Sequence, residues 1–345
     1  MNRDINPLRE IITFNGAQEG IVSIFAACCD PGDEVIVVEP YFDAYLQAAT
    51  LFQLKTHGIP LELPPLVREE YQSKEKSVRS FSAGELVLDM ERLEEMITPK
   101  TKLLVLNTPH NPTGKVFTMS ELEDIATIVR RHPQLTVLSD EVYEFMSFAP
   151  SVHTRIASLP DMFDRVISLY SAGKTFSCTG WRVGFAIAPA NLAGPILQVH
   201  NAIPFCGATP FEVAISTAFK KGTENGYFTE LPNMLEKKRD ILVAALTSAN
   251  LNPVIPQGGY FVTCDASRLP FSSSVLQRKT SSSSSLSPDV QMALHLVEHC
   301  GLAVIPTSPF YTKQHQHLAG STIRLAYCKD DVTLQKAVAA IQALV

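Results

Sequence analysis

The stretch Ser171–Gly184, SAGKTFSCTGWRVG, directly follows the apolar run Val166–Leu169. This order predicts a buried strand that ends in a ligand-binding turn. Small residues flank Lys174 and let a bulky ligand approach, and a lysine that has lost part of its hydration is a usable amine nucleophile. Ser171 and Arg182 can both reach one phosphate, the arginine through a forked, charge-assisted contact. Taken alone, the segment also fits an ordinary solvated lysine at a strand end.

Short apolar runs of this kind recur between helical patterns along the first 225 residues or so. Their near-continuous hydrophobicity indicates a mostly parallel sheet covered by helices on both faces, which is an α/β fold. The expected strands are Val35–Val38, Leu103–Leu106, Leu135–Leu138, Val166–Leu169 and Val183–Ile187. The expected helices are Gln18–Cys29, Ser120–Arg131 and Pro210–Lys220.

Three more polar segments stand at strand ends or at a helix start. Asn107–Gly114 follows one predicted strand, Ser139–Tyr143 follows the next, and Asn15–Gly20 opens a helix. Open α/β sheets bind ligands at the carboxyl ends of their strands, and the free N–H groups of a helix start bind phosphate. Each segment is individually well explained as a turn or a helix cap. Four such segments at one edge of the sheet favour a binding site.

The chain length of 345 residues predicts two domains. The large α/β domain is expected at 1–235, and a smaller α+β domain at 236–345. A long charged helix around Tyr227–Ala249 is expected to link the two domains. The small domain should contain a serine-rich insertion at 270–288, which is expected to be mobile and without a chemical role. Its expected strands are Gly258–Val262, Leu302–Ile305 and Thr322–Tyr327, and its expected helices are Asp289–His299 and Val332–Leu344.

Composition narrows the possible partners and the compartment. A net charge of −6 with scattered basic residues gives no general attraction to nucleic acid or to an anionic membrane. The seven cysteines form no CxxC pair, which indicates a reducing compartment. The N-terminus has no apolar signal core and no stretch predicts a membrane span. We therefore expect a cytoplasmic protein, or a mitochondrial one if a targeting segment is missing from the N-terminus.

Four motifs together resemble the fold-type-I aminotransferases that depend on pyridoxal phosphate (PLP). They are NTPHNPTGKVF (107–117), SDEVYEFM (139–146), SAGKTFSCTGWRVGF (171–185) and STIRLAYCKDD (321–331). The resemblance runs from about Pro7 to the C-terminus and is closest to the kynurenine aminotransferase and cysteine-S-conjugate β-lyase branch. It is highly specific for PLP chemistry and much less specific for the substrate.

The resemblance implies a role for each matching residue. Lys174 matches the lysine that binds the cofactor covalently and moves the substrate proton, and Asp140 matches the aspartate that keeps the cofactor's ring nitrogen protonated. Asn111 and Tyr143 match the pair that hydrogen-bonds the ring oxygen. The remaining cofactor positions are the ring-stacking Phe42, the supporting Asn107, and a phosphate cup of Gly16, Ala17, Gln18, Ser171 and Arg182.

Arg324 matches the arginine that grips the substrate α-carboxylate, with Asn111 beside it. The implied activity is transfer of the amino group of kynurenine, or of another aromatic or sulfur-containing amino acid, to a 2-oxo acid such as 2-oxoglutarate. The alternatives are a β-lyase acting on cysteine conjugates and a catalytically silent protein of the same fold. The family also implies a homodimer.

The chain departs from the family pattern at its N-terminus. The residues that family members carry before the equivalent of Pro7 are missing, and they normally supply a covering arm, a glycine at the substrate and a tyrosine that reaches the neighbouring subunit. Activity, stability and dimerisation are the properties expected to depend on them.

Other ligand-like patterns favour simpler explanations: His295, His299 and Cys300 lack a second pair of zinc ligands, so no metal is expected. Ser171 lacks a G-x-S-x-G elbow, and Gly16–Gly20 lacks a dinucleotide fingerprint.

Overall fold

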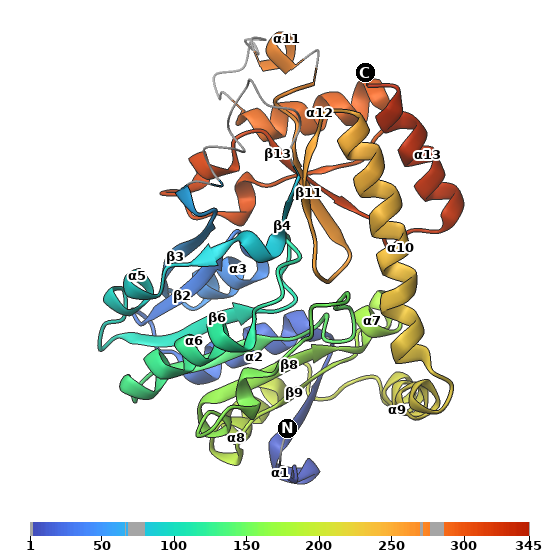
Figure 1. Cartoon of the computed structure of the whole chain (residues 1–345). Helices are drawn as coiled ribbons and strands as arrows, with labels where there is room; N and C mark the ends of the chain where they lie inside the picture. Colours follow the sequence, from blue (N-terminus) through green and yellow to red (C-terminus); the bar gives the residue numbers. More distant parts are fainter. Residues whose placement is uncertain (1–2, 66, 68–79, 270–271, 277–285, 345) are drawn as a thin grey trace.

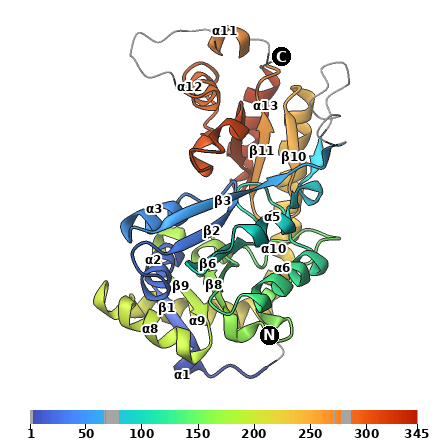
Figure 2. The ribbon, with the colours of Figure 1, turned by 90° about the vertical axis from the view of Figure 1, so that its left-hand side faces the viewer.

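A computed structural model describes residues 3–65, 67, 80–269, 272–276 and 286–344. Within these residues the chain forms a large sheet with flanking helices and a smaller sheet stacked at one end of it (Figure 1). The two chain ends lie at opposite ends of the molecule in both Figure 1 and Figure 2. The confirmed fold class is α/β, with a mostly parallel central sheet.

The large sheet contains eight strands among the described residues, and its central pairs are parallel. The outer pairs β1–β9, β8–β9 and β3–β5 are antiparallel. In spatial order the strands are β1 (Ile11–Phe14), β9 (Gly184–Ile187), β8 (Val166–Ser171), β7 (Thr136–Asp140), β6 (Thr101–Asn107), β2 (Glu34–Glu39), β3 (Lys55–Glu62) and β5 (Val87–Leu88). Chain order therefore reverses between β2 and β6, which is where open sheets of this type bind ligands.

Alternate residues of each central strand pack into different cores. On β2, Val35 and Val37 belong to one hydrophobic cluster, whereas Ile36 and Val38 belong to the other. The first cluster includes residues of α2 (Ala17–Cys28), α3 (Ala44–Leu51) and α8 (Ala190–Ala202), and the second includes residues of α5 (Met90–Glu95) and α6 (Met119–Arg131). Because both faces of the sheet are buried, the strands read as apolar runs rather than as alternating patterns.

The smaller sheet lies at the upper end in Figure 1. In the described part of the chain it has five strands, in the order β12 (Ile305–Pro306), β13 (Thr322–Ala326), β11 (Phe261–Asp265), β10 (Asn252–Ile255) and β4 (Phe81–Ser82). Its core contains residues of α10 (Tyr227–Ser248), α12 (Pro288–Cys300) and α13 (Asp331–Gln342), and also Val142, Tyr143 and Met146, which follow β7. The segment after β7 thus connects the two cores.

The long helix α10 runs beside both sheets (Figure 1). The domain boundary expected near residue 235 falls inside this helix, and β4 comes from the N-terminal half of the chain. The division into 1–235 and 236–345 therefore stays a prediction. Other described helices are α1 (Pro7–Glu10), α7 (Ala172–Thr175), α9 (Thr209–Glu224) and α11 (Ser272–Leu276).

Two strand predictions were wrong in extent. The run Gly258–Val262 starts with a turn, since Gly259 has φ 76°, and its strand begins only at Phe261. Of Leu302–Ile305 only Ile305 is in a strand. Leu302 and Val304 are apolar because they are buried in a loop after helix α12, which ends at the left-handed Gly301. The serine-rich insertion lies outside the described residues, apart from Ser272–Leu276 and 286–288.

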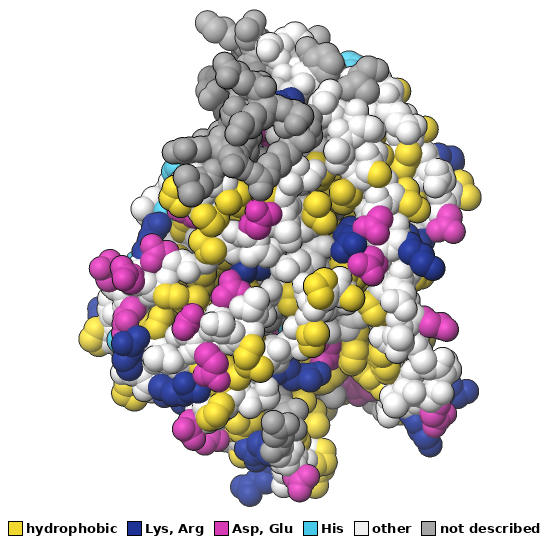
Figure 3. Space-filling view, viewed as in Figure 1, with side chains coloured by type: hydrophobic (Ala, Val, Ile, Leu, Met, Phe, Trp, Pro, Cys, Tyr) yellow, Lys and Arg dark blue, Asp and Glu magenta, His cyan; other side chains and the backbone are white. Residues whose placement is uncertain are grey.

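Surface charge, helix hydrophobicity and the state of the cysteines can be compared with the composition. Acidic and basic side chains are interspersed on the face shown in Figure 3. Among the described residues, no helix combines the length and the hydrophobicity that a membrane crossing requires. All seven cysteines are free thiols.

Candidate active site

The sequence-predicted site residues converge at the carboxyl ends of four parallel strands. Phe42 follows β2, Asn107 ends β6, Asp140 ends β7 and Ser171 ends β8. A cavity of about 270 Å³ opens there. It is lined by Ala17, Gln18, Ile21, Phe42, Asn107, Asn111, Asp140, Val142, Tyr143, Ser171, Lys174, Thr179, Arg182, Phe261 and Arg324. Every predicted site residue except Gly16 lines this one cavity, and Gly16 lies directly beside it.

One end of the cavity is built to hold an anion. Gly16 directly precedes helix α2, has φ 84° and offers no side-chain cap, so the first N–H groups of the helix are open to a ligand. The guanidinium of Arg182 lies against this helix start, where a Cβ on Gly16 would be only 2.5 Å from its Nη2. A Cβ on Gly184 would be 2.6 Å from the backbone N of Ala17. Two glycines therefore let Arg182 and β9 lie directly against the start of α2, next to the N–H groups that can bind an oxyanion.

The buried carboxylate of Asp140 lies on another wall of the cavity. Its Oδ2 accepts a 2.5 Å hydrogen bond from the Tyr45 hydroxyl, and its Oδ1 accepts a 3.3 Å bond from the Val142 N–H. Burial raises the pKa of Asp140 to about 6, while these two hydrogen bonds and the charge of Lys174 act in the opposite direction. It has no ion-pair partner among the described residues, so a cationic ligand atom would stabilise it.

A chain of hydrogen bonds ties the ends of β6 and β7 to the small sheet. The Asn107 side-chain amide donates to the Asp140 carbonyl at 2.8 Å, and Asn107 Oδ1 accepts from the Asn111 N–H at 2.7 Å. Asn111 Oδ1 then accepts a 2.9 Å bond from Nη1 of Arg324, which is on β13. The two asparagines thus fix the distance between Asp140 and Arg324 across the cavity.

Arg324 presents its charge to the cavity without a carboxylate partner in the described part of the chain. Its guanidinium carbon is 4.1 Å from the centre of the Phe261 ring and 4.8 Å from that of Phe310. Burial lowers the pKa of Arg324. An arginine stacked between two rings keeps its planar fork in one orientation, and such a fork matches a carboxylate.

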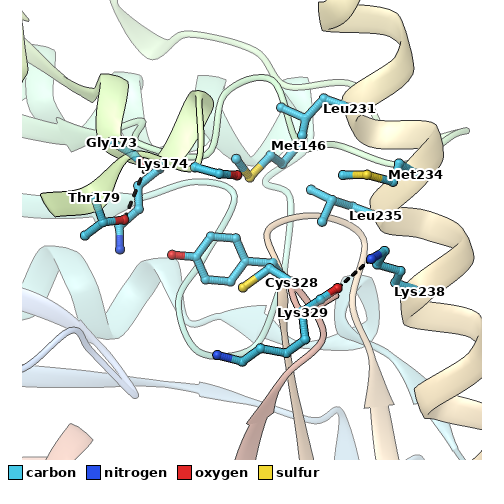
Figure 4. Close-up of a pocket in the computed structure, with 12 residues that line it drawn as sticks. Met146, Gly173, Lys174, Thr179, Leu231, Met234, Leu235, Lys238, Cys328 and Lys329 are labelled. Carbon is cyan, nitrogen blue, oxygen red and sulfur yellow. Dashed lines mark hydrogen bonds between the residues drawn. The ribbon is translucent and has the colours of Figure 1, made fainter. Parts of the chain in front are cut away.

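Lys174 lines both this cavity and a second one of about 290 Å³, whose lining residues are drawn in Figure 4. Its Nζ lies 5.6 Å from the centre of the Tyr260 ring. The second cavity has an apolar wall of Leu231, Met234 and Leu235, all from α10. Its basic Lys238 is already engaged, with the Lys329 carbonyl at 2.5 Å and with Asp331 at 2.8 Å. The Lys174 amine is therefore accessible to a ligand in the first cavity and adjoins an apolar space.

Several residues that shape the site were not expected from the sequence. Tyr45 bonds Asp140, and Tyr260 and Phe261 pack edge-on against Tyr143 at centroid distances of 5.1 and 6.4 Å. For Tyr45 a signal existed, since it lies three residues after Phe42 in the turn that leads into α3, and the two rings meet at 5.8 Å. Tyr260 and Phe261 approach the site only through the pairing of the small sheet, which no local pattern reveals.

The suspected metal pattern does not form a cluster. The rings of His295 and His299 lie 4.6 Å apart on α12, and neither residue lines the cavity. Across the residues that the structure covers, no group of three or more His, Cys, Asp or Glu could hold a metal ion. The expected absence of a metal remains a prediction.

Comparison with known proteins gives the family. Residues 2–341 match the family model of class I and II aminotransferases. The chain belongs to this family. It is 41% identical over 339 residues to a kynurenine–oxoglutarate transaminase of Dictyostelium discoideum, covering 97% of this chain and 76% of that protein. It is 33% identical to the human kynurenine–oxoglutarate transaminase 1, covering 97% of this chain and 77% of the human protein.

Solved structures agree with this assignment. Yeast Bna3p, described as a candidate kynurenine aminotransferase, superposes with a TM-score of 0.89 at 32% identity, covering 97% of this chain and 76% of the yeast chain. An N-succinyldiaminopimelate aminotransferase of Mycobacterium tuberculosis gives a TM-score of 0.85 at 29% identity, covering 100% of this chain and 80% of that one. The protein is thus an aminotransferase, and the predictions of the family, the fold type and the enzyme class are confirmed.

Proposed function

We propose that this aminotransferase moves the amino group of kynurenine, or of another aromatic or sulfur-containing amino acid, to a 2-oxo acid such as 2-oxoglutarate, with PLP as its cofactor. The observation that carries the proposal is the convergence of an amine, a buried acid and an anion cup, from distant parts of the chain, on one cavity.

The residues present fit PLP. Its phosphate would be held by the start of α2, by Ser171 and by Arg182, whose guanidinium lies against the helix start because Gly16 has no side chain. The ring nitrogen would pair with Asp140, the ring face with Phe42, and the ring oxygen with Asn111 and Tyr143. When bound, PLP supplies an electron-accepting ring to the carbon that loses its proton.

The chain's own groups would do the rest of the work. Asp140, which lacks an ion partner within the described residues, would keep a cationic ring nitrogen charged. Arg324 would hold the substrate α-carboxylate, with Asn111 fixing its position. Lys174 would hold the cofactor covalently through Nζ until the amino group of the substrate displaces it. The amine of Lys174 freed in this way would then take the proton from Cα of the amino acid and return it at the cofactor side.

Two observations support the proposed substrate class. Curated relatives that are 41% and 33% identical to this chain are named kynurenine–oxoglutarate transaminases. In addition, the second cavity beside Lys174 has an apolar wall of Leu231, Met234 and Leu235, and therefore offers packing surface to a bulky, uncharged side chain.

A substrate panel tests the proposal. Purified protein loaded with PLP should show a visible absorption band that changes on addition of kynurenine, methionine or an aromatic amino acid. Product analysis then separates the activities, because a transaminase yields an oxo acid and glutamate whereas a β-lyase yields pyruvate and ammonia from a cysteine conjugate. A band that does not respond to any amino acid would favour the catalytically silent alternative.

We further propose a homodimer, formed by a second copy of this chain seated on the apolar surface beside Arg182. Ile203 at the end of α8, Phe205 in the loop that follows and Val213 on α9 are more than half exposed, at 54, 76 and 61%. Trp181, next to Arg182 in the chain, stacks on Phe211 at 5.2 Å, and both rings are 42% exposed. Patches of this kind normally mark an interface. Sedimentation equilibrium of wild type and of Phe205→Glu tests this, since the variant should shift toward monomer.

A cytoplasmic location is the accompanying proposal. Its support is the set of seven free thiols, which suits a reducing compartment. Fractionation of cells that express the endogenous protein separates it from the mitochondrial alternative.

A further inference from the structure

The hydrogen bond between Tyr45 and Asp140 joins two parts of the site that are 95 residues apart. The Tyr45 hydroxyl lies 2.5 Å from Oδ2 of Asp140, and the two residues are 2% and 3% exposed. Such a short, charge-assisted bond is shielded from water and is stronger than a bond between neutral groups.

Tyr45 is well placed to hold the carboxylate in one orientation. Its ring belongs to the core that packs α2 and α3 on the large sheet, so the hydroxyl cannot move independently of the fold. The other carboxylate oxygen is held by the Val142 N–H, and each oxygen therefore has a separate donor. Phe42 lies just before α3, where its carbonyl accepts from the Tyr45 N–H at 3.1 Å, and its ring meets that of Tyr45 edge-on at 5.8 Å.

Charged and titratable neighbours determine what this bond does. Burial favours the neutral acid, and the nearby carboxylate of Glu141 acts in the same direction. The Tyr45 hydroxyl, the Val142 N–H and the Lys174 ammonium favour the ionised form, and Tyr143 is the other titratable group at close range. Among these, Tyr45 is the side chain that bonds the carboxylate directly.

We propose that Tyr45 is a positioning residue of this aminotransferase, and that its hydroxyl keeps Asp140 ionised and oriented for a cationic ring nitrogen of the cofactor. The inference rests on the proposed use of PLP. It assigns Tyr45 a role through Asp140 rather than through contact with the substrate.

The chain offers a matched control four residues earlier. Tyr41 is 1% exposed, and its buried hydroxyl has no hydrogen-bond partner in the described structure. Tyr41→Phe and Tyr45→Phe therefore remove the same atom from equally buried rings, but only the second removes a bond to Asp140.

The experiment measures PLP binding by fluorescence of Trp181, the single tryptophan, which adjoins Arg182. Titrations run from pH 5.5 to 8.5. At neutral pH Tyr45→Phe should weaken PLP binding about 10-fold, which is less than the full value of one charge-assisted bond because the Tyr45–Asp140 bond also exists in the cofactor-free protein. The pH below which affinity falls should also move upward, because Asp140 loses a donor that stabilises its charge. Tyr41→Phe should match the wild type in PLP affinity and in its pH profile. Because PLP itself gains and loses protons in the same way with every variant, its own ionisation does not affect the comparison.

A second test covers a folding defect. In an Asp140→Asn background, Tyr45→Phe should change neither the PLP affinity nor its pH profile, because the carboxylate is gone. The proposal is overturned if Tyr45→Phe binds PLP like the wild type, if Tyr41→Phe shows an equal loss, or if the effect persists without the carboxylate. Wild-type protein that does not bind PLP through Lys174 would instead refute the proposed function.

Discussion

Replacing Arg324 by lysine keeps the positive charge but removes the planar fork that is proposed to bind the substrate carboxylate. In the structure the guanidinium lies 4.1 Å from the centre of the Phe261 ring and donates to Asn111 at 2.9 Å. A lysine ammonium can form one strong bond to a carboxylate there, but not two parallel ones. Losing one charge-assisted bond costs about 2 kcal/mol. We therefore expect kcat/KM to fall roughly 30-fold, since 1.4 kcal/mol is a factor of ten.

The assay compares both half-reactions, because the amino acid and the oxo acid each carry a carboxylate beside the reacting carbon. Arg324→Lys should lower kcat/KM for both to a similar extent and leave the PLP affinity unchanged, and Arg324→Ala should lower kcat/KM further. Arg239→Lys is the matched control, since Arg239 lies 4.8 Å from the Phe148 ring but pairs with Glu236 outside the cavity. Loss of PLP binding with an unchanged KM would show that Arg324 serves the cofactor instead.

Three further predictions concern the cofactor end of the site. Gly16→Ala should weaken PLP binding by about tenfold or more, since its Cβ would lie 2.5 Å from Arg182. Gly226→Ala is the control, because Gly226 also precedes a helix with a positive φ of 80° but has open space around it. This variant should bind PLP normally in the same titration. In cofactor-free protein the Asp140 pKa of about 6 exceeds its ordinary 3.8, so the folded protein holds this proton more tightly than the unfolded chain does. The stability that protonation of Asp140 contributes is therefore fully present below pH 3.8 and is lost as the pH rises through about 6. Asp140→Asn should accordingly raise the thermal midpoint of cofactor-free protein more at pH 8 than at pH 5; an equal change at both would contradict the assignment. Lys174→Ala should reduce steady-state turnover by at least about 10²–10⁴-fold.

Local patterns were sufficient for the large sheet because its strands are buried on both faces. The run Val35–Val38 is apolar throughout, and its residues alternate between two cores because both faces of the sheet are covered by helices. The turns after the strands were equally informative. Lys174 and Asp140 belong to motifs whose place at strand ends was predicted, and the structure brings both to one cavity.

The sequence was less informative where long-range packing decides. Leu302 reads as a strand residue but is buried in a loop, because burial and strand formation both select apolar residues. The contact of Glu39 with His315 at 2.5 Å ties the end of β2 to a segment more than 270 residues later. Neither partner lies in a motif, and only the packing of the small sheet on the large one brings them together.

The central claim is that Lys174 is the residue that binds the cofactor. Reduction of the PLP-loaded protein with borohydride, followed by proteolysis and mass spectrometry of the peptides, tests it directly. The account predicts the phosphopyridoxyl mass on the peptide that contains Lys174, and its disappearance in Lys174→Ala. The same mass on the peptide of Lys238 or Lys329, or on none, would contradict the account.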